Sequence, residues 1–114
     1  MHEASIAQHI IEDIERRIEA GDIKGRIRTI HMSVGRLTTI APENLQFLFE
    51  VLSADSILAG SQLAVEHVPL RLKCAACRAE YEMENVDFRC IYCESHDVDI
   101  LTGRELIIES VEVE

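Results

Sequence analysis

The sequence lacks any apolar run of the roughly 20 residues that a helix needs to cross a bilayer. Its amino terminus has neither the basic region nor the apolar stretch of a signal peptide. Cysteine is absent outside one compact motif, so no thiol is left over for a disulfide framework. These absences predict a soluble protein of the reducing cytoplasm that does not associate with a membrane.

Basic residues are scarce. The 114 residues include 11 lysines and arginines against 21 aspartates and glutamates, which gives a formal net charge of −10. A surface with this charge repels the phosphate backbone, so we expect no nucleic-acid partner. No nucleophile or acid–base pair stands out either, so we nominate no catalytic residue and expect a protein that is not an enzyme.

The four cysteines form one motif, with two residues inside each pair and twelve residues between the pairs. They are Cys74, Cys77, Cys90 and Cys93. Two such pairs present four thiolates to one ion, and this shell completes the tetrahedral coordination of zinc without an open position for water or substrate. We therefore predict a structural Zn(II) site, and a zinc hydrolase is disfavoured.

A pair of redox-active motifs is the alternative for the same cysteines. Redox motifs of this spacing usually stand alone at a strand-to-helix junction of a thioredoxin-like pattern, which favours zinc here. Neither pair is followed by the glycine that is common in zinc knuckles, because Arg78 and Glu94 stand there instead. The sequence therefore defines the geometry of the knuckles less well than the presence of the metal.

The stretch around the cysteines has too few apolar side chains to fold without help. Structural zinc supplies an apparent binding free energy of about 10–16 kcal/mol, which exceeds what so small a core provides. We therefore predict a zinc-binding (zinc-ribbon) domain at residues 71–103, inserted into an α+β domain formed by residues 1–70 and 104–114.

Apolar periodicity predicts the elements of the main domain. Helical spacing marks residues 3–20 and a second helix from Pro42, whose buried stripe is expected to be Leu45, Leu48, Phe49 and Leu52. Period-two patterns mark strands at residues 26–34, 62–70 and 104–113. We predict an α+β fold with two helices on a small antiparallel sheet of about three strands, and the zinc lobe running from the end of one strand to the start of its antiparallel neighbour.

The amino terminus, Met1-His2-Glu3, is the second informative place. A free amine, the following backbone amide and the imidazole of His2 can chelate one ion, and an all-nitrogen planar set suits Ni(II) or Cu(II). The first amides of a helix have no acceptor within it, so a metal can displace their protons without breaking the helix. By spacing alone the pattern also describes an exposed terminal histidine.

Five features occur together in order along nearly the whole chain. They are Met1-His2-Glu3 opening a helix, Gly35 after a strand, the sequence Pro-Glu-Asn-Leu-Gln-Phe at 42–47 opening the second helix, Gly60 before Leu63, and the paired cysteines. In this combination the chain resembles the HypA/HybF family of hydrogenase-maturation nickel metallochaperones.

The resemblance implies that His2, with the backbone of Met1 and Glu3, binds Ni(II) as transient cargo while the cysteine lobe is structural. It implies delivery for the maturation of nickel-iron hydrogenase, and of urease in some organisms, with the GTPase HypB and the precursor of the hydrogenase large subunit as partners. A homodimer is left open. The alternative is a zinc-ribbon scaffold that binds protein partners and uses no nickel.

The other histidines are weaker candidates. His96 lies three residues beyond Cys93, where a solvated loop residue is favoured over one that exchanges into the zinc shell. His9 shares a helix face with His2 but lies about 10 Å further along the axis, so one ion does not reach both. We expect His31 and His67, on strand patterns, to be hydrogen-bonded or exposed.

Overall fold

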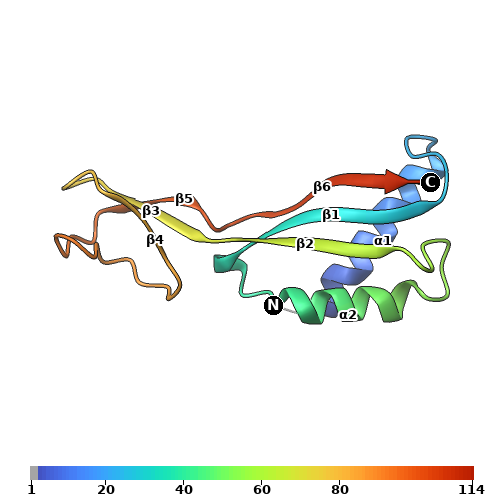
Figure 1. Cartoon of the computed structure of the whole chain (residues 1–114), viewed down its shortest axis with the longest axis horizontal. Coiled ribbons are helices and arrows are strands. Elements are labelled where there is room, and N and C mark those ends of the chain that lie inside the picture. Colours follow the sequence, from blue (N-terminus) through green and yellow to red (C-terminus); the bar gives the residue numbers. More distant parts are fainter. Residues whose placement is uncertain (1–2) are drawn as a thin grey trace.

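The structure is a computed structural model that describes residues 3–114. The molecule is elongated, with extents of 52 × 24 × 18 Å, and Figure 1 shows both helices at one end and the cysteine lobe at the other. Met1 and His2, two of the three residues of the predicted nickel site, lie outside the described residues. Within residues 3–114, no helix has the length and apolar character needed to cross a bilayer.

The first helix, α1 (Glu3–Glu19), is amphipathic as the periodicity predicts. Its buried residues follow helical spacing and are Ala7, Ile10, Ile11 and Ile14. Gly21 follows the helix with a φ of +82°, a conformation that favours glycine. The sequence therefore predicts both the buried face and the end of this helix correctly.

The central strand of the main sheet is β1 (Ile27–Gly35), flanked by β2 (Gln62–Val68) and β6 (Leu106–Val113). The predicted α+β class, with two helices and a three-stranded sheet, is confirmed, and β1 and β6 are antiparallel as expected. The pairing of β1 with β2 differs, because these strands run parallel. The helix α2 (Pro42–Ser53) connects them and returns the chain to the end where β1 began, as a parallel pair requires.

The core of the main domain lies between the sheet and the two helices. Alternate residues of β1 meet both helices there: Ile30, Met32 and Val34 are buried with Leu45 and Phe49 of α2. Leu48 is partly buried against this core.

The predicted stripe of α2 is wrong at its last position, because Leu52 is 39% exposed whereas Ser53 is buried. The helix ends at Ser53. Leu58, in the turns that follow, is fully buried in the same core. The segment after the helix therefore completes the core, so the helix does not need an apolar residue at position 52.

The cysteine lobe has its own three-stranded antiparallel sheet, in the order β4-β3-β5. Its strands are β3 (Leu70–Cys74), β4 (Glu80–Met83) and β5 (Val98–Thr102). A second buried cluster, separate from the first, consists of Leu70, Leu72, Cys74, Tyr81 and Cys90. The domain bounds inferred from the sequence stay a prediction, and Leu70, the last residue assigned to residues 1–70, packs in this second cluster.

The strands that enter and leave the lobe are not neighbours, contrary to expectation. The chain passes from β2 through Pro69 into the lobe and returns through Gly103 to β6, and β1 lies between β2 and β6. Because β1 is buried along most of its length, it takes the central position, where both of its edges are paired.

The two lobes join where the end of β1 meets the start of the return segment. The amide of Gly35 donates to the carbonyl of Glu105 at 2.7 Å, and that of Leu37 donates to the carbonyl of Gly103 at 2.8 Å. A Cβ at Gly35 would lie 2.1 Å from the Gly103 carbonyl oxygen. Gly35 has an extended backbone, with φ −79° and ψ 151°, so it is the space and not the conformation that requires glycine.

A short 3-10 turn, η1 (Arg36–Thr38), continues from this junction toward the lobe. The Arg36 Nε donates to the carbonyl of Glu84 at 2.8 Å, and Leu37 packs against the lobe's buried cluster. Both lobes therefore hold this segment through direct contacts.

We predict that Gly35→Ala lowers the free energy of unfolding by about 1–3 kcal/mol, the usual cost of forcing extra atoms into a packed site. Amide exchange at residue 35 and at Leu37 should quicken, because their hydrogen bonds bridge the junction. Urea unfolding and hydrogen exchange measure the two effects. Gly21→Ala, which adds a Cβ where no atom lies within 4 Å, should leave exchange at the junction unchanged. Wild-type stability in Gly35→Ala would show that the junction has free space.

Candidate metal centre

The four cysteines lie on two similar tight turns of the lobe. Cys74 ends β3 and Cys77 follows in the next turn, while Cys90 and Cys93 lie on the segment between β4 and β5. In each turn the residue after the second cysteine donates its amide to the carbonyl of the first, at 2.8 Å in the first pair and 3.0 Å in the second. The two turns therefore project their thiols in the same way.

The residues that stand in place of the usual glycines adopt a left-handed conformation. Arg78 and Glu94 both have a φ of 64°. Such a conformation costs a residue with a side chain roughly 1–2 kcal/mol. The surrounding turn hydrogen bonds hold it in place, so the knuckle geometry forms without glycine.

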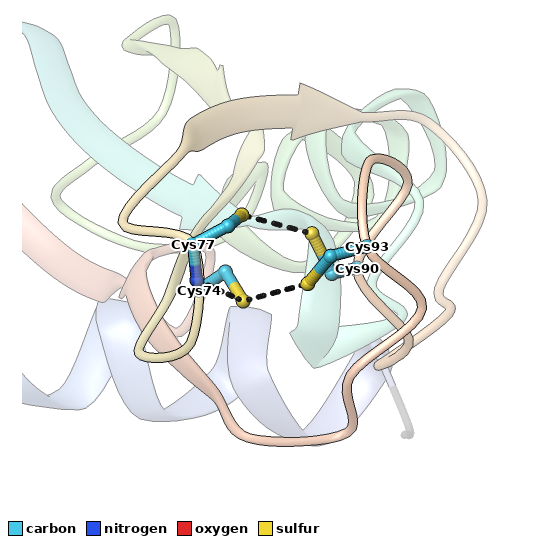
Figure 2. Close-up of side chains that lie close together, drawn as sticks. All are labelled: Cys74, Cys77, Cys90 and Cys93. Atoms are coloured by element: carbon cyan, nitrogen blue, oxygen red, sulfur yellow. Dashed lines mark hydrogen bonds between the residues drawn. The ribbon is translucent and has the colours of Figure 1, made fainter.

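The four sulfur atoms converge on one point between the two turns (Figure 2). All lie within 4.8 Å of one another, with 3.5 Å between Cys74 and Cys93 and 3.7 Å between Cys77 and Cys90. A tetrahedral zinc ion with ligand distances of about 2.3 Å spaces its sulfurs about 3.8 Å apart. A disulfide needs about 2.05 Å, so the arrangement fits one tetrahedral ion and not a redox pair.

Exposure divides each pair of cysteines in the same way. Cys74 and Cys90, the first of each pair, are buried, whereas Cys77 and Cys93 are exposed. Each buried sulfur accepts a backbone amide, from Cys77 at 3.5 Å and from Tyr92 at 3.4 Å. These amides compensate negative charge on the sulfurs that solvent reaches least.

The thiols differ in pKa because burial, backbone amides and the neighbouring cysteines act differently on each of them. Burial raises the pKa of Cys90, but the amides of Cys93 and Tyr92 act against it and lower that pKa to about 6. The Ser95 amide lowers the pKa of Cys93, whereas the Cys74 side chain and burial raise it, to about 12. Neighbouring thiolates therefore do not all ionise without a cation between them, and metal binding releases protons.

The histidines that the sequence singles out lie away from this cluster. His96 is exposed and does not belong to it, as the solvated-loop interpretation predicts. His31 Nε2 lies 2.8 Å from Glu112 Oε1 across the β1–β6 pair, and His9 and His67 are exposed. Among residues 3–114, the four cysteines form the one group of histidine, cysteine and acidic side chains close enough to share an ion.

The start of α1 is held to the loop before α2. The carboxylate of Glu3 accepts a hydrogen bond from the amide of Ala41 at 3.3 Å. From the sequence we assign Glu3 a role through its backbone alone, so this hydrogen bond of the side chain was missed. No local pattern marks it, because the contact joins residues 38 positions apart.

Comparisons with known proteins agree on one family. The family model described as "Hydrogenase/urease nickel incorporation, metallochaperone, hypA" matches residues 1–113. Hydrogenase maturation factor HypA of Desulfosudis oleivorans is 38% identical over 113 residues, which cover 99% of this chain and 98% of that protein. Guanidine hydrolase-activating protein A of Synechocystis sp. is 36% identical over 113 residues, which cover 98% of this chain and 94% of that protein.

The solved structures share the fold. The solution structure of the Ni metallochaperone HypA from Helicobacter pylori covers 99% of this chain and 97% of its own, with a TM-score of 0.65 at 22% identity. A second HypA solution structure gives a TM-score of 0.68, also at 22% identity, over 100% of this chain and 97% of its own. The chain belongs to the HypA family of metallochaperones for nickel incorporation into hydrogenase and urease, a family without enzymatic activity.

Proposed function

We propose that this chain binds Ni(II) through His2 and the backbone nitrogens of Met1 and Glu3, and delivers the ion to a nickel enzyme during its maturation. The observation that carries the proposal is the match to the nickel-incorporation family, which includes residues 1–3. One imidazole and a few backbone nitrogens commit little of the protein to the ion. Such a site holds nickel moderately and releases it readily to the next protein.

The start of α1 supports a site at this place. The described part of α1 starts at Glu3, and in general the first amides of a helix have no acceptor within the helix itself. Nickel can replace a proton on such an amide without breaking a helical hydrogen bond. The contact between the Glu3 carboxylate and the Ala41 amide also holds this end of the described helix against the main domain.

We further propose that the four cysteines hold Zn(II) as a structural ion. The sulfur spacing and the closed four-thiolate set support zinc, since no coordination position remains for a substrate. The ion supplies the stability that the lobe's five-residue buried cluster lacks.

We propose that the recipient of the nickel is the precursor of the nickel-iron hydrogenase large subunit. The GTPase HypB is the proposed partner in this delivery, which takes place in the cytoplasm. A relative at 36% identity carries the name guanidine hydrolase-activating protein A, so a guanidine hydrolase is a second candidate recipient. Nickel transfer from the loaded chain to each purified apo-enzyme, with its GTPase present, distinguishes the two.

We predict that His2→Ala abolishes specific nickel binding, because it removes the one side-chain ligand of the proposed site. Calorimetric titration of Ni(II) into protein with an untagged amino terminus measures this. Zinc content and helical circular dichroism should stay at wild-type values.

His9→Ala is the matched control, since His9 is an exposed histidine of α1. It should bind nickel like the wild type. If His2→Ala and wild type bind nickel equally, the site assignment fails. If the wild type binds none, the scaffold alternative, in which the lobe contacts protein partners without nickel, is favoured.

We predict that Cys74→Ser or Cys90→Ser loses zinc and unfolds the lobe. These two sulfurs are buried, and structural zinc contributes an apparent free energy of about 10–16 kcal/mol. The main domain, residues 1–70 and 104–114, should keep its amide protection because α1, α2 and β1 bury a core of their own. Metal analysis and residue-resolved hydrogen exchange test this. Collapse of the whole chain on zinc loss would contradict the inserted-domain interpretation.

A further inference from the structure

Tyr81 carries a buried hydroxyl without a partner. It lies on β4 opposite Leu72 and is only 5% exposed. Within the described residues its hydroxyl is buried and has no hydrogen-bond partner. Buried polar groups in native proteins are almost always paired, and an unpaired one costs free energy that phenylalanine would avoid. We therefore expect the hydroxyl to gain a hydrogen-bond partner when the lobe binds its metal.

The surroundings of Tyr81 point to the cysteine cluster. Tyr81 shares a buried cluster with Cys74 and Cys90. Its ring packs edge-to-face on that of Tyr92, with centroids 5.9 Å apart and planes at 82°. Tyr92 lies between Cys90 and Cys93 in the second turn, so the tyrosine pair fixes the Tyr81 ring against that turn.

The hydroxyl is a donor in this environment. A phenolic hydroxyl has an ordinary pKa of about 10 and keeps its proton near neutral pH. Burial raises the pKa of Tyr81 further, and negative charge at Cys90 and Cys74 acts in the same direction. Within residues 3–114 the hydroxyl has no hydrogen-bond partner, and a neutral thiol is a weak acceptor. A thiolate is a stronger acceptor, because charge-assisted hydrogen bonds are shorter and stronger.

We propose that Tyr81 is a positioning residue of the metal centre, whose hydroxyl donates a hydrogen bond to the Cys90 sulfur when that sulfur is a metal-bound thiolate. The inference rests on the zinc site proposed above. Cys90 already accepts the Tyr92 amide at 3.4 Å, and the Tyr81 hydroxyl becomes an additional donor. Together these donors hold the sulfur in position and reduce the charge that it shares with the ion.

Tyr81→Phe tests the proposal, because it removes the hydroxyl and keeps the ring. Loss of such an outer hydrogen bond typically weakens metal affinity about 10- to 100-fold, and we expect zinc affinity to fall in that range in competition with a chelator. In the cobalt-substituted protein, the thiolate-to-cobalt charge-transfer band should move to lower energy, because the sulfur becomes more electron-rich. The metal-free variant should be no less stable than metal-free wild type, since it loses an unpaired buried hydroxyl.

Tyr92→Phe is the matched control. Tyr92 is 67% exposed, so loss of its hydroxyl should leave zinc affinity and the cobalt spectrum unchanged. Unchanged affinity and spectrum in Tyr81→Phe overturn the proposal, as do equal losses in the two variants. If wild-type protein binds neither zinc nor cobalt, the metal site itself is wrong, and this result is distinct from a failed role of Tyr81.

A measurement on the wild type makes the test independent of any variant's folding. In protein loaded with ¹¹³Cd, the Tyr81 hydroxyl proton should exchange slowly and show scalar coupling to cadmium through the Cys90 sulfur. A rapidly exchanging proton without such coupling overturns the proposal.

Discussion

The close contact of two backbone segments, at Gly35 and Gly103, is the constraint on which the shape of the molecule depends. Here the end of β1 and the segment returning from the lobe approach so closely that a single added carbon would lie 2.1 Å from a carbonyl oxygen. The hydrogen bonds of Gly35 and Leu37 cross the same gap. Because η1 follows directly and contacts Glu84 and the lobe's buried cluster, the two ends of the molecule are connected through packed backbone and not through a free linker.

The cysteine lobe depends on a different kind of interaction. Its sheet buries few apolar side chains, and two of the five buried residues are the cysteines Cys74 and Cys90 themselves. The candidate metal site and the core of the lobe therefore overlap, and Tyr81 packs in the same core. In an apolar core alone its buried hydroxyl is unfavourable, whereas our proposal gives it a thiolate as acceptor. The main domain, by contrast, is held by isoleucine, leucine and phenylalanine contacts between its helices and sheet.

Local patterns predicted the elements well because helix and strand periods are properties of neighbouring residues. The apolar stripe of α1 and the alternation of β1 appear as expected. The pairing of the strands and the end of α2 were harder to predict from local patterns. The antiparallel expectation failed for β1 and β2 although a helix lies between them in the chain, an order that favours a parallel pair. Leu52 fits the helical period of the buried residues but is exposed. The helix ends one residue later, and Leu58, from the segment after the helix, packs in the core instead.

By itself the sequence determined the two helices, the three strands of the main sheet and the spacing of the four cysteines, because these are local properties of the chain. The three strands of the cysteine lobe were not predicted. The sequence also carried the family resemblance, which resides in short motifs along the chain. Only the tertiary structure decided which strands are neighbours, why Gly35 needs to be glycine, and that the Tyr81 hydroxyl lies buried beside the cysteines. Each of these depends on atoms brought together from distant parts of the chain, and no period or local spacing encodes such distances.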